Sequence, residues 1–281
     1  MIKNTTSIIH PIRVDFEIPL SSEIKLPRFV NLFVLNGENL HFIDSGVAAA
    51  FPQITSFTEG MGKRTDQVKT ILLTHSHPDH IGAAKLIQEH SSCKIMASFE
   101  EKSWIEDTNL QFQQRPVPGF FHLVEGSVKI DQSVQNNDII DLEKGITIQV
   151  ISTPGHSKGS VSFLLNEENA LFCGDAILLP GELPVFENVT DYFESLEKIK
   201  TLNPDVLYSA WDKPRHKNEI PEILEKSAEY IRKIQSAAKE TAKNFNETKS
   251  IDFCRAVLEA LGQNEKIANP LLLKSFLACL D

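Results

Sequence analysis

The chain has 281 residues, 41% of them hydrophobic, which is enough to bury one large core together with an appendage. Its formal net charge of −10 argues against a polyanionic partner such as RNA, because nucleic-acid binding needs a positive surface. No run of eighteen or more apolar residues occurs, so neither a membrane span nor a membrane partner is expected.

The first predicted elements form a β-hairpin. Residues 31–35 and 40–43 are rich in strand-forming side chains and flank Asn36-Gly37, a dipeptide that favours tight turns. The second strand runs into Asp44-Ser45-Gly46, so a carboxylate is expected directly after the end of this strand.

The most informative segment follows a predicted strand at residues 70–73. His75, His77, Asp79 and His80 stand there in the spacing H-x-H-x-D-H. Side chains alternate along a strand, so a strand that ends in a tight turn can project the first two histidines to the same side. Imidazole and carboxylate groups suit zinc, iron or manganese rather than calcium. The segment therefore predicts a metal site.

Two later motifs also place a polar residue after a short strand-like run. His156 lies in the segment 152–160, and Asp175 lies in the segment 170–176. If each motif ends a strand, both side chains face a common edge with the histidines before them. A helix is expected over residues 81–90 and a strand over 94–97.

The segment 98–138 is less regular and combines aromatic residues with proline and glycine. Two interpretations are equally open: it forms a wall of a substrate pocket beside the metal site, or its aromatic residues anchor a long surface loop.

Helices dominate the rest of the chain. Thr190 is the predicted N-cap of a helix over 191–202, which Asn203-Pro204 ends. A long helix follows from Pro221, a second spans 251–261, and a third spans 271–280 after Asn269-Pro270.

The four motifs, taken in this order, resemble those of the metallo-β-lactamase-fold hydrolase superfamily over about residues 12 to 216. The resemblance implies an α/β fold, a four-layer αββα sandwich with a C-terminal helical extension. The catalytic domain would then span residues 1–216 and the extension residues 217–281. This extension is similar in architecture alone to the helical tail of glyoxalase II-type thioesterases, which helps to form their substrate site. A role in packing or in a homodimer is the equal alternative.

The resemblance also implies a ligand set for two divalent metal ions, expected to be zinc, with iron or manganese as alternatives. One ion would be held by His75, His77 and His156 and the second by Asp79 and His80, with Asp175 bridging the two. Asp44 matches an early aspartate of the family that supports the site from just outside it.

The sequence departs from the family at the last metal motif. Trp211 falls where the final histidine is expected, and an indole N–H cannot ligate a metal. Asp212 or His216 could complete the second site; otherwise the second ion is held weakly.

The implied chemistry is hydrolysis. A bound cation lowers the pKa of water toward neutrality, and Asp79 can orient the resulting hydroxide and relay its proton, besides acting as a ligand. We expect a small-molecule ester or thioester as the substrate. A lactone, a phosphodiester, the oxidation carried out by single-iron persulfide dioxygenases, and metal or partner binding without catalysis are the alternatives.

The cysteines and the N-terminus bear on the compartment. Cys93, Cys173, Cys254 and Cys279 show no C-x-x-C spacing, which is typical of reduced, buried thiols. Residues 1–6 contain no long apolar region, so no signal peptide is expected and a cytoplasmic location is predicted.

Overall fold

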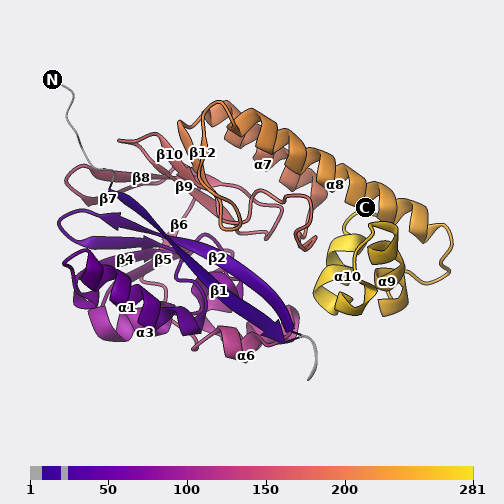
Figure 1. Ribbon diagram of the computed structural model, residues 1–281, viewed down its shortest axis with the longest axis horizontal. Coiled ribbons are helices and arrows are strands. Elements are labelled where there is room, and N and C mark those ends of the chain that lie inside the picture. The colour runs from indigo at the N-terminus through magenta and orange to yellow at the C-terminus, as the bar shows by residue number, and fades with distance from the viewer. Residues whose placement is uncertain (1–7, 20–24, 281) are drawn as a thin grey trace.

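Two β-sheets stacked face to face, with helices outside each of them, make up the fold (Figure 1). The computed structural model describes residues 8–19 and 25–280, so the expectation for residues 1–6 lies outside the described part. No helix in the described part is long and apolar enough to cross a membrane. This architecture confirms the predicted four-layer sandwich.

The first sheet contains six strands in sequential order. Neighbours among the first three are antiparallel, and the third strand begins a run of parallel pairs. The strands are β1 (Ile9–Pro19), β2 (Lys25–Asn36), β3 (Leu40–Ile43), β4 (Val68–Leu72), β5 (Lys94–Ser98) and β6 (Gln132–Val134). The pairing of β2 with β3 confirms the predicted hairpin.

The second sheet has the order β12-β11-β10-β9-β8-β7. Strands β10 and β11 are parallel, and the other neighbours are antiparallel. The strands are β7 (Ile139–Glu143), β8 (Ile146–Ser152), β9 (Val161–Leu165), β10 (Ala170–Phe172), β11 (Val206–Tyr208) and β12 (Arg215–His216).

Three hydrophobic clusters separate the four layers. One lies between the sheets and includes Phe33 and Phe163. Another lies between the first sheet and its outer helices, and the third joins the second sheet to the helices after it. Strands β3, β9 and β10 are buried along their whole length because they are covered on both faces.

The helix predicted over 81–90 is two helices, α2 (Pro78–Ile81) and α3 (Ala84–Ser91). They are separated at Gly82, where a Cβ atom would lie only 2.3 Å from the carbonyl oxygen of Leu123. The close approach of a distant segment therefore sets this break. Helix α1 (Phe51–Gly60) lies in the same layer, preceded by the 3₁₀ turn η1 (Ala48–Ala50) and followed by η2 (Thr65–Gln67).

The segment between β5 and β7 is more regular than its composition indicates. It contains the short helices α4 (Lys102–Glu106), α5 (Thr108–Gln114) and α6 (Phe120–Leu123), besides strand β6. The N-cap of α5 is Asp107, whose carboxylate accepts hydrogen bonds from the backbone N–H groups of Asn109 and Leu110.

On the other side of the molecule, α7 (Val189–Leu202) packs against α8 (Ile220–Ala242). The predicted N-cap at Thr190 is wrong. Asn188 caps α7, because its backbone is extended and its side chain accepts a hydrogen bond from the Asp191 backbone N–H at 3.0 Å. The predicted end is confirmed, since Asn203 terminates α7 in the left-handed conformation.

The C-terminal helices follow the predicted pattern. They are α9 (Ile251–Ala260) and α10 (Pro270–Leu277), joined through the 3₁₀ turn η3 (Glu265–Ile267). They lie below the far end of α8, beside the end of the β1–β2 ribbon (Figure 1). Ile231 and Phe253 share one hydrophobic cluster with Leu171 and Leu207 of the second sheet. The division of the chain at residues 216 and 217 stays a prediction.

Candidate metal centre

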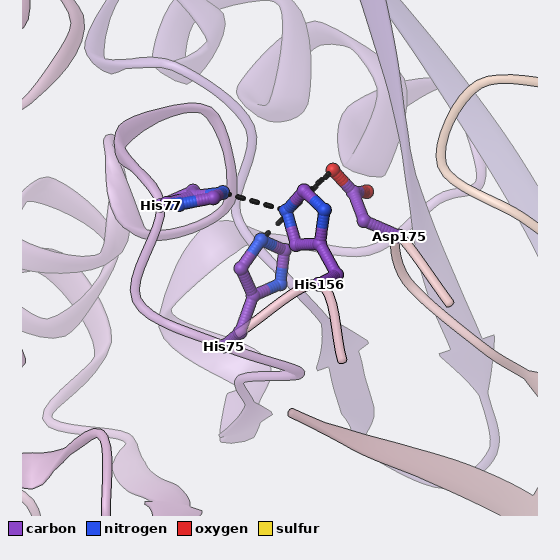
Figure 2. A group of neighbouring side chains, drawn as sticks. All are labelled: His75, His77, His156 and Asp175. Carbon is purple, nitrogen blue, oxygen red and sulfur yellow. Dashed lines mark hydrogen bonds and ion pairs between the residues drawn. The ribbon is translucent and has the colours of Figure 1, made fainter. Parts of the chain in front are cut away.

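Four predicted site residues converge between the ends of three strands (Figure 2). His75 and His77 follow β4, His156 follows β8 and Asp175 follows β10. One ligand atom from each of the four lies within 4.8 Å of the others. The Nε2 atom of His156 is 2.7 Å from Nδ1 of His77 and 3.3 Å from Oδ2 of Asp175.

This geometry fits a bound cation. All four side chains are buried, yet Nε2 of His75 makes no hydrogen bond within the described part of the chain. Buried polar atoms normally have a partner, and a cation is the partner that would satisfy several imidazole nitrogens and a carboxylate at once. The ring of His156 is fixed from behind, because its Nδ1–H faces the carbonyl oxygen of Val185 at 2.8 Å.

His80 and Asp79 lie on the adjoining side of Asp175. The Nε2 atom of His80 is 3.1 Å from Oδ1 of Asp175 and 3.9 Å from Oδ2 of Asp79. Asp175 thus faces His156 with one carboxylate oxygen and His80 with the other, as a bridging group would. The assignment of Asp79 and His80 to a second ion stays a prediction.

Asp44 supports His80 from the side away from the cluster. Its carboxylate lies 2.8 Å from His80 Nδ1 and accepts hydrogen bonds from the backbone N–H and hydroxyl of Thr74, each at 2.8 Å. These contacts turn Nε2 of His80 toward Asp175. Asp44 is held in the left-handed backbone conformation with φ of 61°, so the turn after β3 has an unusual geometry.

Burial and neighbouring charges shift the pKa values of the four histidines in different directions. Burial lowers the pKa of His75, His77 and His156, and cationic neighbours act in the same direction on all three, although the charge of Asp175 partly opposes them at His156. Burial opposes the charge of His80 too, but the carboxylates of Asp175, Asp44 and Asp79 raise its pKa well above the ordinary value. Three neutral imidazoles are therefore available as ligands.

Comparison with known proteins agrees with this site. A family model described as the metallo-beta-lactamase superfamily matches residues 26–211, which include all four clustered residues. The chain belongs to the metallo-β-lactamase superfamily. The three-histidine, one-aspartate cluster is typical of metal sites in this superfamily, and the chain is a metallohydrolase of that class.

Relatives within the superfamily are distant. The beta-lactamase-like protein 2 homolog of Caenorhabditis elegans is 29% identical over 228 residues, which cover 78% of this chain and 69% of that protein. A hydroxyacylglutathione hydrolase of Hyphomonas neptunium is 30% identical over 186 residues, covering 65% of this chain and 64% of that enzyme. The chain thus spans about two thirds of the length of these relatives.

A solved structure shows the same fold over nearly the whole chain. A metallo-beta-lactamase family protein of Thermus thermophilus superposes with a TM-score of 0.71 at 21% identity. The superposition covers 96% of this chain and 93% of that one, so the likeness extends to the C-terminal helices.

Trp211, which the sequence analysis places where the superfamily's last histidine is expected, lies beside the carboxylate of Asp175. Although burial opposes it, the charges of His80 and His156 and a hydrogen bond from Trp211 lower the pKa of Asp175. The indole N–H can only donate, so Trp211 can stabilise the Asp175 carboxylate but cannot ligate a metal ion beside it. The Arg28 guanidinium lies over the indole ring, 4.2 Å from its centroid, and helps to hold it in place.

Neither predicted substitute for the missing histidine belongs to the cluster. The carboxylate of Asp212 accepts from Arg215, with Nη2 3.0 Å from Oδ1. His216 is exposed on strand β12, where it pairs with Val206 at the edge of the second sheet. Asp212 is thus engaged by an arginine and His216 is exposed at a sheet edge, and the assignment of either residue to the second site stays a prediction.

A buried ionic network behind the cluster escaped the sequence analysis. Arg115 contacts Nε2 of His77 through Nη2 and donates from Nη1 to the hydroxyl of Ser157 at 3.1 Å. Glu101 accepts from the backbone N–H groups of Ser76 and Gly159, both at 3.0 Å. This network ties the loop that carries His77 to the loop after His156. No motif marks Arg115 or Glu101. What identifies them is that both charged side chains are buried, and burial cannot be recognised from the sequence alone.

A cavity opens directly beside the cluster, and His77, Asp79, His156 and Asp175 contribute to its wall. The segment 98–138 does form part of that wall, as one of the two interpretations held. It does so through Val117, Pro118 and Leu123, whereas Phe112, Phe120 and Phe121 pack against one another in tilted and edge-on contacts.

We expect Asp44→Asn to weaken metal binding by about 10- to 100-fold, the usual effect of removing a partner behind a ligating histidine. Asparagine tolerates the left-handed backbone that Asp44 adopts, so the change removes the charge behind His80 without adding strain. Titration with zinc in competition with a chromophoric chelator measures this. Equal zinc affinity in the variant and the native protein would show that His80 needs no orienting carboxylate.

Glu182 gives the cavity a pH-dependent stability. Burial raises its pKa to about 8, from an ordinary 4.5. Between these values the folded protein keeps a proton that the unfolded chain has lost, so stability falls as pH rises. Relative to Glu182→Gln, the free energy of unfolding of the native protein should fall by up to about 1.4 kcal/mol per pH unit between pH 5 and 8. Urea unfolding of both proteins measures this, with the exposed Glu229→Gln as control. Parallel stability curves would contradict the expectation.

Proposed function

We propose that this protein hydrolyses an ester or thioester of a small molecule, using two divalent ions, with zinc as the expected metal and the second ion held more weakly. The observation that carries the proposal is the convergence of His75, His77, His156 and Asp175 at the wall of a cavity. The hydroxyacylglutathione hydrolase relative supports an acyl bond as the target.

The residues around the cluster divide the work. His75, His77 and His156 would hold the first ion, and His80 and Asp79 the second, with Asp175 between them. A divalent ion bound there supplies Lewis acidity and lowers the pKa of a water ligand toward neutrality.

Asp79 is the candidate proton acceptor. Its carboxylate reaches the cavity wall, and burial together with the charge of Asp175 raises its pKa, which makes it a stronger base. The apolar lining beside it excludes water from the rest of the substrate. We place the reaction in the cytoplasm, because all four cysteines are free and buried, as reduced thiols would be.

The first experiment is elemental analysis of protein purified without added metal, followed by a panel of thioesters, esters, lactones and phosphodiesters. About two zinc ions per chain and turnover of thioesters or esters are the expected results. Turnover of phosphodiesters alone would overturn the proposal.

A second candidate function is the oxidation of a persulfide at a single iron. Trp211 is the observation that favours it, because the indole leaves the second ion without its usual histidine and binds Asp175 instead. One iron per chain, with oxygen consumption on a persulfide, would establish this candidate in place of the hydrolase.

A further inference from the structure

The cavity beside the metal cluster is walled by four parts of the chain that are far apart in sequence. Leu26 comes from β2, Val117 precedes α6, Leu183 lies in the loop after Asp175, and Ile267 and Leu271 come from η3 and α10. Most of the side chains that line it away from the cluster are apolar. The C-terminal helices therefore provide part of the wall facing the reacting centre.

Charged groups are sparse in this wall. Beyond the metal cluster and the adjacent Asp79, the charged side chains among the described residues that line the cavity are those of Arg28 and Glu182. The guanidinium of Arg28 stacks on Trp211, and burial raises the pKa of Glu182 to about 8, which keeps that carboxyl neutral at pH 7. A ligand rich in carboxylates or phosphates, such as glutathione or a nucleotide, would meet one cation there and a largely apolar surface.

We propose that this cavity binds the apolar acyl group of the substrate, so that the protein acts on esters or thioesters of aliphatic or aromatic carboxylic acids. The inference rests on the proposed function and adds the substrate class to it. The continuity of the apolar wall with His77, His156 and Asp175 supports this occupant, because an acyl chain lying in the cavity brings its carbonyl carbon to the cluster.

Binding of straight-chain carboxylates tests the inference without turnover. Butyrate, hexanoate and octanoate, each below its aggregation concentration, are titrated into the zinc-loaded protein by calorimetry. Each added methylene that enters an apolar site should tighten binding up to about fourfold, so octanoate should bind on the order of 10- to 100-fold more tightly than butyrate. Affinities independent of chain length, or tighter binding of glutathione than of octanoate, would overturn the proposal.

A pair of variants on one helix locates the binding site. Leu271 and Leu273 are both half-buried on α10. Of these two described residues, Leu271 lines the cavity and Leu273 does not. Leu271→Gln should reduce octanoate affinity about 5- to 10-fold with little effect on butyrate, as expected for a lost apolar contact. Leu273→Gln should leave both affinities unchanged. Equal effects of the two substitutions would place the chain elsewhere.

The outcome for binding and the outcome for catalysis are separable. A chain-length gradient without turnover of any ester or thioester would retain the acyl cavity and reject the hydrolase. Turnover of thioesters without a chain-length gradient would retain the hydrolase and reject the acyl cavity.

Discussion

Replacing His156 with alanine is expected to lower both metal content and hydrolytic kcat/KM by more than about 100-fold. This exceeds the effect of removing a residue that only hydrogen-bonds to a metal ligand, because His156 is itself a proposed ligand. His156 has the shortest contacts in the cluster, and its ring is already fixed by the Val185 carbonyl oxygen. Alanine removes a nitrogen that no neighbouring side chain can replace, because the ring positions around it are set by other strands.

His216→Ala is the matched control for this prediction. His216 is an exposed histidine at the edge of the second sheet, outside the cluster, so its removal should change neither metal content nor rate. Elemental analysis and steady-state kinetics of both variants provide the measurements. Retention of full metal content by His156→Ala would remove His156 from the ligand set, and a metal loss in His216→Ala would restore that residue to it.

The cluster could be predicted from the sequence because its geometry is local to strand ends. His75, His77, His156 and Asp175 each follow a strand within a few residues, and neighbouring strand ends bring such positions to one edge of the fold. Asp44 follows the same logic at the end of β3. Patterns of alternation and spacing contain this information without reference to tertiary contacts.

Other features depend on contacts between distant segments and could not be read in the same way. The break between α2 and α3 arises from the Leu123 carbonyl oxygen against Gly82, some forty residues away. Arg115 is fully buried only because Glu101, Glu187 and Ser157 surround it. In sequence, such an arginine resembles any solvated one, since burial of a charge requires partners that the fold supplies.

The role of Trp211 follows from the family resemblance and the structure taken together. The resemblance predicts that a ligand is missing at this position, and the structure places Trp211 against Asp175, where it helps to lower the pKa of that carboxyl. Asp212 is engaged by Arg215 and His216 is exposed, so neither of the two predicted substitutes lies free beside the tryptophan. A second ion at the proposed position would therefore depend on Asp79, His80 and the carboxylate of Asp175.

Trp211→His is accordingly expected to tighten binding of the second ion by at least about tenfold, the scale on which partners of a metal site act. The imidazole adds a nitrogen ligand and also removes the indole N–H that stabilises the Asp175 carboxylate. Cobalt(II) titration followed by visible absorption, with elemental analysis for stoichiometry, measures the second binding event. Trp211→Phe separates the two effects, because phenylalanine removes the N–H donor, keeps a ring beneath Arg28 and adds no ligand. If the histidine and phenylalanine variants bind the second ion equally well, the indole hydrogen bond weakens the site and the missing ligand does not. If neither variant differs from the native protein, Trp211 has no part in setting metal stoichiometry.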